Sequence, residues 1–407
     1  MLDKFFSLSQ NYIQNYDQTF VRYFSKTIGF KHRLTILIGQ RGIGKTTTLI
    51  QHILHTYNND PFTTKALFIQ ADHFLTQKSS LYEIAEEFVL HGGELLCIDE
   101  IHKYKNWSIE LKSMYDTFTK LAIIATGSSA LEIHKGSHDL SRRAITHKMV
   151  GMSFREYIGL SHGIEIESYL LDDILKGHQL IAQAIIEKLE VKGLRIIPTF
   201  KEYLKVGYYP YFHDMGSEEL FYITLEQNIH ATVENDLLFV YPSLSGNSIK
   251  KILKLLSVIR QSVPFTPDMS GLKKTIDVGD ERTLKNYLKY LEDAALIKML
   301  PKSSNPMAAF EKPEKIYLDN PNLLYIDDVN IGTVRETFFM NALSSQHALC
   351  AAPKGDFLVD EKYTFEVGGK SKDFTQIKDV PDSYLAIDDT EIGTRNKIPL
   401  WIFGFLY

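Results

Sequence analysis

The stretch of sequence that decides the fold is Gly39-Gln40-Arg41-Gly42-Ile43-Gly44-Lys45-Thr46, which fits the phosphate-binding pattern G-x-x-x-x-G-K-[ST]. An apolar run typical of a strand, Leu34–Ile38, precedes it, and a run with helical spacing begins at Thr46. In that context the glycines let backbone N–H groups turn inward around a phosphate at the positively polarised start of a helix. The alternative is a glycine-rich turn that binds nothing.

Each part of this loop has an expected role. We predict that Lys45 reaches the β and γ phosphates and that the hydroxyl of Thr46 faces Mg²⁺. The backbone from Gly39 through Thr47 would surround the phosphates. The sequence therefore predicts a nucleotide site.

An acidic pair ends a second apolar run, Leu95-Leu96-Cys97-Ile98-Asp99-Glu100. Beside a phosphate loop, we expect Asp99 to hold the magnesium through water, and Glu100 to orient and deprotonate the attacking water. Alone, such a run means only that a strand has reached the surface. A glutamate in the second position favours hydrolysis over nucleotide binding alone.

A third apolar run ends in small hydroxyl residues, Leu121–Ala125 followed by Thr126-Gly127-Ser128-Ser129. A strand next to Glu100 that delivers a hydroxyl near the γ phosphate would report whether that phosphate is present, and we select Ser128 for this role. The same serines would also serve as a turn that caps a short helix at 130–134.

Composition sets limits on partners and location. The chain has 407 residues, 44% hydrophobic and 23% charged, which is ordinary for two or three globular domains. A net charge of −5 gives no general attraction to nucleic acid or an anionic membrane. Two cysteines cannot build a disulfide framework, and we expect Cys97 to be inert core. With no secretory signal and no long apolar span, we expect a cytoplasmic protein without a membrane contact.

Strands and helices alternate along the first part of the chain, as in a parallel sheet covered on both faces. Ser80 with Glu83 resembles a capping box that opens a helix, and Trp107–Phe118 has helical spacing. The expected strands are Leu34–Ile38, Ala66–Gln70, Glu94–Ile98, Leu121–Ala125 and Ala144–Val150. This is an α/β core with a P-loop, and a mostly helical segment follows it.

The pattern near residues 245–302 predicts three helices and a β wing, which together make a winged helix-turn-helix. Asp280 is positioned to cap the last helix, which would bury one apolar face and present Arg282, Lys285, Asn286 and Lys289 on the other. Residues 245–300 contain ten Lys and Arg against six Asp and Glu, so duplex DNA is one expected partner. A solvated face that contacts only protein would have the same pattern.

The landmarks of this chain resemble the prokaryotic AAA-type ATP-binding protein family, whose members join an AAA-like core to a C-terminal domain of unknown function. The family-like segments are Gly39–Thr46, Leu96–Lys103 with Trp107, Thr126–Ser129, Ser141–Arg143, Met152–Tyr157, Gly207–Pro210 and Gly332–Thr337. The resemblance implies ATP and Mg²⁺ as cofactors, AAA architecture and a winged helix after the core.

AAA-like proteins often place an arginine past the sensor strand, where it contacts the γ phosphate of a neighbouring subunit. Arg142 and Arg143 lie at that point, so a homo-oligomer with one of them acting in trans is expected, and an exposed arginine pair is the alternative. We interpret His102 and His134 as surface residues near the nucleotide pocket.

The C-terminal strands resemble restriction-endonuclease-like folds, in which an Asp and a Glu bind Mg²⁺ and a Lys two residues after the Glu activates water. Asp356 and Glu366 fit the acids, with Gln376 further on. The lysine position is Gly368, and Lys370 lies about 6–7 Å too far along an extended strand. We therefore expect a degenerate domain that does not cut DNA, with strands at Phe357–Val359, Tyr363–Val367, Tyr384–Ile387 and Leu400–Phe405 and a helix at Val334–Ser344.

The sequence as a whole predicts a Mg²⁺-dependent ATPase in which the nucleotide state switches how the C-terminal domains are presented to a DNA or protein partner. Expected boundaries are an AAA-like P-loop core at 1–150, a helical segment at 151–244, a winged helix at 245–325 and the endonuclease-like domain at 326–407. Two alternatives stay open, an ATP-gated DNA nuclease and a nucleotide switch that does not hydrolyse ATP.

Overall fold

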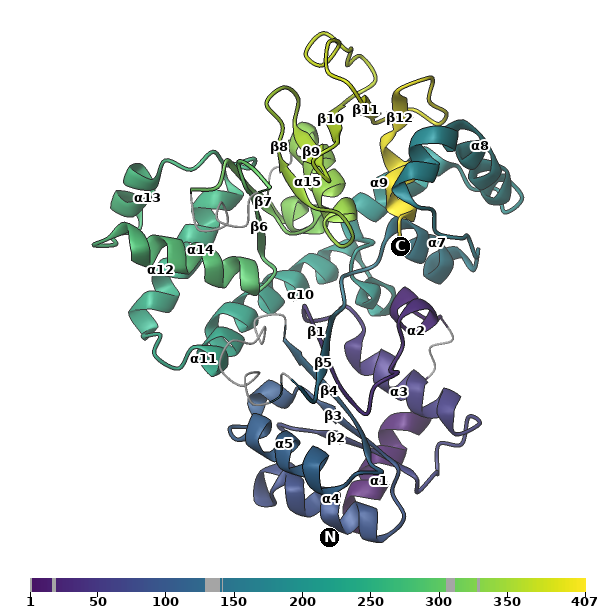
Figure 1. Cartoon of the computed structure of the whole chain (residues 1–407), viewed down its shortest axis with the longest axis vertical. Helices are drawn as coiled ribbons and strands as arrows, with labels where there is room; N and C mark the ends of the chain where they lie inside the picture. The colour runs from purple at the N-terminus through teal and green to yellow at the C-terminus, as the bar shows by residue number, and fades with distance from the viewer. Residues whose placement is uncertain (1, 17–19, 129–139, 141, 305–311, 328–329) are drawn as a thin grey trace. The chain divides into compact units, whose positions relative to one another are not determined.

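The computed structural model describes residues 2–16, 20–128, 140, 142–304, 312–327 and 330–407. The chain divides into two compact units (Figure 1). Unit 1 consists of Met1–Val150 with Glu234–Leu244, and unit 2 of Gly151–Val233 with Ser245–Tyr407. The predicted boundaries at residues 150, 244 and 325 stay a prediction.

A parallel five-stranded sheet forms the centre of unit 1, in the order β2-β3-β4-β1-β5. This confirms the predicted α/β fold class. Its strands are β1 (Leu34–Gly39), β2 (Ala66–Gln70), β3 (Leu95–Asp99), β4 (Ala122–Ser128) and β5 (Ile145–Lys148). The helices of this unit are α1 (Leu2–Gln14), α2 (Tyr23–Thr27), α3 (Lys45–Thr56), α4 (Leu81–Leu90), α5 (Trp107–Thr117) and α11 (Leu237–Val240).

Both faces of this sheet are covered, which explains why its inner strands are apolar without alternation. On one face Leu49, Ile50 and Ile53 of α3 pack against strand residues such as Phe68. On the other, α4 and α5 pack against β1 and its neighbours. The predicted capping box is present, since Ser80 accepts the backbone N–H of Glu83 and Glu83 reaches back to the N–H of Ser80. Cys97 is buried, and burial raises the pKa of its thiol, as expected for inert core.

Unit 2 begins with four helices, as the loss of strand alternation predicts. They are α7 (Phe154–His162), α8 (Leu171–Glu190), α9 (Ile196–Val206) and α10 (Glu218–Ala231). Among the described residues, no helix combines the length and apolar character that crossing a membrane requires.

Three further helices and a two-stranded antiparallel sheet follow, in the predicted order. They are α12 (Gly246–Arg260), α13 (Met269–Thr275), α14 (Glu281–Asp293), β6 (Ile297–Leu300) and β7 (Lys315–Leu318). Asp280 caps α14 by accepting the backbone N–H of Thr283 at 2.8 Å. Leu284, Tyr287, Leu288 and Leu291 of α14 are buried, as the helical spacing predicts.

The last part of unit 2 is helix α15 (Ile331–Leu343) and a mixed sheet in the order β12-β11-β10-β9-β8 (Figure 1). The strands are β8 (Leu349–Ala351), β9 (Phe357–Val359), β10 (Tyr363–Gly368), β11 (Ser383–Ile387) and β12 (Lys397–Pro399). The prediction of a strand at Leu400–Phe405 is wrong, because these residues form a 3-10 helix, η8. Every residue of η8 is buried, and a short apolar run buried on all sides has no periodicity that separates strand from helix.

Candidate functional site

The phosphate loop runs from the end of β1 into α3, as the sequence predicts. Gly42 and Gly44 have φ angles of 77° and 95°, a region that side-chain-bearing residues rarely adopt. A Cβ on Gly39 would lie 2.5 Å from the carbonyl oxygen of Met149, so only glycine fits there. The glycines are thus required by the turn itself, and they leave backbone N–H groups at the start of a helix.

Lys45 is buried at the first position of α3, and its amine donates to the carbonyl oxygens of Gly39 at 2.9 Å and Gln40 at 2.8 Å. Burial lowers the pKa of this amine from its ordinary value, and the acidic residues nearby oppose that shift. Both carbonyls belong to the loop, so the amine of Lys45 lies against the first residues of the predicted phosphate-binding loop.

A second buried cation supports the loop from outside. Arg22 donates to the carbonyl oxygen of Ile43, and to that of Val150 at 2.9 Å. The sequence analysis missed Arg22, because nothing in the pattern around it indicates a partner in the loop.

Asp99 ends β3 and meets the loop through hydroxyl groups. Thr46 Oγ1 donates to Asp99 Oδ2 at 2.8 Å, and Thr126 Oγ1 on β4 donates to Asp99 Oδ1. Burial raises the pKa of Asp99, as does the charge of Glu100, while these hydrogen bonds and Lys45 pull it down. The structure therefore brings together two predicted metal-site residues and adds Thr126, which the sequence analysis did not select.

Glu100 follows with a left-handed backbone, φ 54° and ψ 42°, which is uncommon for any residue other than glycine. Its backbone N–H donates to Thr126 Oγ1 at 3.1 Å. Its carboxylate oxygen Oε2 lies 3.6 Å from both His102 Nε2 and Lys103 Nζ. Because strained backbone persists only where surrounding contacts impose it, these contacts fix where the Glu100 side chain emerges.

His102 is 4% exposed, so its assignment to the surface was wrong. Its Nδ1 accepts the backbone N–H of Ser128 at 3.4 Å, which leaves the ring proton on Nε2. That nitrogen faces Glu100 and, at 3.5 Å, Asp236 Oδ1. Ser128 is buried at the end of β4, and the His102 ring lies between its backbone N–H and the carboxylate of Glu100. Ser129, Ser141, His134 and the helix predicted at 130–134 lie outside the described residues.

Asp236 joins this site from a distant part of the sequence. It is fully buried, and Arg41 of the loop donates to it through Nε at 2.9 Å and through Nη2 at 2.6 Å. Burial alone would raise its pKa, but Arg41 and His102 outweigh burial and hold the pKa well below its usual range. Asp236 ends a π-helical turn, Thr232–Asp236, a conformation frequent at functional sites. No sequence signal marks it, since 195 positions separate it from Arg41.

The two arginines proposed to act in trans differ in their surroundings. Arg143 makes a two-pronged ion pair with Asp116, at 2.7 and 2.9 Å, whereas Arg142 is exposed. Of these two side chains, that of Arg142 is the more accessible to solvent.

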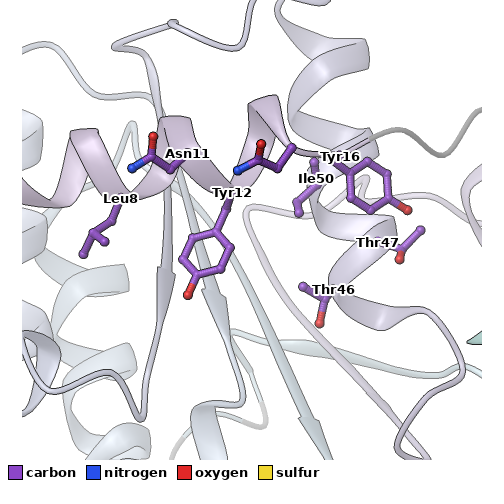
Figure 2. Close-up of a pocket in the computed structure, with 8 residues that line it drawn as sticks. Leu8, Asn11, Tyr12, Tyr16, Thr46, Thr47 and Ile50 are labelled. Atoms are coloured by element: carbon purple, nitrogen blue, oxygen red, sulfur yellow. The ribbon is translucent and has the colours of Figure 1, made fainter. Parts of the chain in front are cut away.

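A pocket of about 480 Å³ opens beside the first turn of α3. Thr46, Thr47 and Ile50 of α3 form one side, and α1 with the residues after it forms the other (Figure 2). The residues contributed by that other side are Leu8, Asn11, Tyr12, Asn15 and Tyr16. Thr46 and Thr47 thus line an open pocket at the start of the loop helix.

Acidic side chains of α14 itself pair with two of the basic residues on its exposed face. Lys285 pairs with Glu281 at 3.0 Å, and Lys289 pairs with Asp293 at 2.7 Å. Arg282 and Asn286 are exposed. DNA binding by this face stays a prediction.

The C-terminal acids also come together, but not with the lysine that the sequence analysis considered. The backbone N–H of Val367, next to Glu366, donates to Asp356 Oδ2 at 2.9 Å. Lys370 is exposed, and Lys372 contacts Glu366.

Comparisons with known proteins identify similarity over two parts of the chain. Residues 31–158 match the family model of the AAA domain, and residues 197–326 match a domain of unknown function (DUF8612). Uncharacterized protein MJ1637 of Methanocaldococcus jannaschii is 29% identical over 399 residues, which covers 90% of this chain and 82% of that protein.

Two solved structures are similar at a low level. The S. cerevisiae Hsp104-ADP complex is 15% identical, with 72% of this chain and 42% of that chain covered and a TM-score of 0.32. C. elegans PCH-2 is 17% identical, with 48% and 57% covered and a TM-score of 0.24. This chain thus spans less than two thirds of either protein, and at such TM-scores neither supports an argument about its function.

Proposed function

We propose that this chain, whose residues 31–158 are an AAA-type P-loop domain, binds ATP with Mg²⁺ and hydrolyses it at the carboxyl ends of strands β1 and β3 in unit 1. The observation that carries the proposal is the hydrogen bond between Thr46 and Asp99, 2.8 Å long. It joins the first turn of the loop helix to the acidic end of β3, which is the pairing a nucleotide-bound magnesium requires.

The residues present fit magnesium. A hard dication prefers oxygen ligands, and a carboxylate with a hydroxyl beside it supplies them next to the phosphates. Thr46 and Asp99 would hold the ion, which when bound neutralises charge on the phosphate oxygens. The loop N–H groups and Lys45 would bind those oxygens directly, because the Lys45 amine already lies among the loop carbonyls.

Glu100 is our candidate for the general base. It would accept a proton from water as the water oxygen attacks the γ phosphorus, and the bond from that phosphorus to the β–γ bridging oxygen would break. The hydroxyl of Thr126 would position Glu100 by accepting the backbone N–H of Glu100. The ring of His102 faces the carboxylate of Glu100. Ser128 would then sense the γ phosphate through His102, which accepts its backbone N–H.

Asp236 supports a route by which the nucleotide state switches the rest of the chain. Segment 234–244 belongs to unit 1, whereas the residues before and after it belong to unit 2. Because Arg41 lies within the phosphate loop and grips Asp236 with two hydrogen bonds, a ligand that draws Arg41 toward phosphate changes the contact holding this segment. We propose that this exchange presents the winged helix and the C-terminal domain to a partner.

A Glu100→Gln variant tests hydrolysis. It keeps the shape of the side chain and removes the base, so ATP should bind and remain uncleaved, with turnover lowered on the order of 10²–10⁴-fold. Equal turnover in the variant and the wild type would reject Glu100 as the base. No turnover in the wild type, despite binding, would make the domain a nucleotide switch.

For the partner, we propose duplex DNA at residues 245–300, and the test is ATP turnover with and without duplex DNA across salt concentrations. Phosphate contacts predict stimulation that declines steeply as salt rises. The absence of any effect at low salt would favour a protein partner for this face.

A further inference from the structure

The carboxylate of Glu100 faces a lysine and a histidine, and each of these also faces a second acid. Glu100 Oε2 is 3.6 Å from Lys103 Nζ and 3.6 Å from His102 Nε2. Lys103 Nζ lies only 2.5 Å from Asp72 Oδ2. His102 Nε2 lies 3.5 Å from Asp236 Oδ1. Neither contact of Glu100 is a close ion pair, because a charged N–H group that hydrogen-bonds to a carboxylate lies about 2.7–2.9 Å from it.

Asp72 reaches this group of side chains from the loop that follows β2. The backbone N–H of Ala71 donates to the carbonyl oxygen of Asp99 at 2.9 Å, which continues the pairing of β2 with β3 beyond Gln70. Thr76 Oγ1 donates to the carbonyl oxygen of Gln70 at 2.8 Å and ties the loop to the end of β2. The loop that carries Asp72 is therefore held beside the acidic end of β3.

Lys103 is the last residue of η2 (Ile101–Lys103), the 3-10 turn that follows Glu100. Its backbone N–H donates to the carbonyl oxygen of Glu100 at 3.0 Å, and Ile101 anchors the turn in the core. Burial lowers the pKa of the Lys103 amine, but the hydrogen bond with Asp72 and the charge of Glu100 outweigh burial and raise that pKa. A charged ammonium group therefore lies beside the proposed base.

The pairing of Lys103 with Asp72 has a consequence for Glu100. An ammonium group at hydrogen-bonding distance from a carboxylate occupies an oxygen lone pair and makes the carboxylate less basic. A general base needs that lone pair to accept the proton of water. Because Asp72 binds the ammonium group more closely, Lys103 attracts the carboxylate of Glu100 without blocking it.

We propose that Asp72 and Lys103 are positioning residues for hydrolysis: Asp72 holds the ammonium group of Lys103 where it orients the carboxylate of Glu100 without forming a close ion pair with it. This role rests on the function proposed above, in which Glu100 accepts a proton from the attacking water. It adds two residues that lie outside both the phosphate loop and the proposed metal site.

The test measures steady-state turnover of MgATP by the full chain, with MgATP binding measured by calorimetry. Lys103→Met should lower kcat about threefold, because His102 still faces the carboxylate of Glu100. Asp72→Asn should lower kcat about tenfold or more, because the released ammonium group then pairs closely with Glu100. Neither change should alter KM or MgATP binding, since both act on the base and not on the phosphates.

A double variant separates positioning from a merely structural role. When Lys103→Met is added to Asp72→Asn, the ammonium group that Asp72 restrains is gone. The kcat of the double variant should therefore rise to that of Lys103→Met alone, which would also exclude misfolding as the cause of the Asp72→Asn defect. Losses that multiply in the double variant would overturn the proposal, because Asp72 would then act without Lys103.

An ion pair at the other end of β3 provides the matched control. Lys65 Nζ lies 2.9 Å from Glu94 Oε1, and both side chains are exposed. Lys65→Met and Glu94→Gln should leave kcat unchanged, and losses there equal to those of the test variants would overturn the proposal.

The same measurements distinguish a failure of this inference from a failure of the proposed function. Wild-type turnover that neither Lys103→Met nor Asp72→Asn changes would overturn the positioning role alone. Binding of MgATP by the wild type without any turnover would overturn the hydrolysis itself, and the positioning role with it.

Discussion

The backbone N–H of Glu100 donates a 3.1 Å hydrogen bond to the hydroxyl of Thr126, and that same hydroxyl donates to Asp99. One side chain on β4 therefore fixes both acids at the end of β3, the proposed metal ligand and the proposed base. This relationship makes Thr126 a positioning residue whose removal should disturb both.

Thr126→Val removes this hydroxyl while keeping the shape of the side chain. Each hydrogen bond contributes about 0.5–1.5 kcal/mol, and about 1.4 kcal/mol corresponds to a tenfold change in rate. We expect ATP turnover to fall about tenfold or more, with Thr126→Ser retaining most of it. Steady-state turnover at saturating MgATP measures this, and unchanged turnover in Thr126→Val would remove Thr126 from the site.

The left-handed backbone of Glu100 predicts a separation of stability from activity. Asparagine adopts this conformation more readily than glutamate or glutamine, and the strain is about 1 kcal/mol. Glu100→Asn should therefore unfold at a higher temperature than Glu100→Gln, although both lose turnover. Calorimetry that found Glu100→Gln more stable than Glu100→Asn would contradict the claim that the backbone of Glu100 is strained.

Asp236 predicts a pH dependence of stability. Its pKa in the folded protein lies well below its unfolded value, so its stabilisation is fully present above the unfolded pKa of about 3.9. The stabilisation is lost as pH falls below that value toward the folded pKa. At pH 7, Asp236→Asn should cost about 1.5–3 kcal/mol. Urea titrations should show that the difference in free energy of unfolding between the wild type and Asp236→Asn becomes smaller below about pH 4. A difference that is the same at all pH values would contradict the ion pair.

Alanine substitutions at Arg142 and at Arg143 should have different effects on ATP turnover. Arg142→Ala should lower turnover by about 10³-fold or more at protein concentrations that permit assembly. Arg143→Ala should mainly loosen the contact with Asp116, and Asp116→Ala should reproduce its effect. Turnover measured across protein concentration separates these cases, and full activity of Arg142→Ala at every concentration would exclude this arginine as a trans contact.

Much of unit 1 could be predicted because its signals are local. A glycine loop needs glycines at fixed spacing, and a buried parallel strand needs a continuous apolar run, so β1 to β5 and the loop follow from the sequence. Asp236 could not be predicted, because its role depends on a chain path that returns to unit 1 after 195 residues. His102 was assigned to the surface for the same reason, since Asp236 is one of the groups that its ring faces.

The C-terminal sheet shows a different limit. Counting along an extended strand placed Lys370 too far from Glu366, and that reasoning was sound for a lysine on the strand. It could not see that a glycine at 368 makes room for Lys372, from the following loop, to fold back. Loops break the regular rise per residue on which such counting depends.

The central claim is that a triphosphate binds at the loop around Lys45 with a metal held at Asp99. The most direct measurement is calorimetric titration of ATP with and without Mg²⁺, using the wild-type chain and a Lys45→Ala variant. We predict magnesium-dependent binding by the wild type and its loss in the variant. ATP binding that ignores magnesium, or that survives the loss of Lys45 unchanged, would contradict the account.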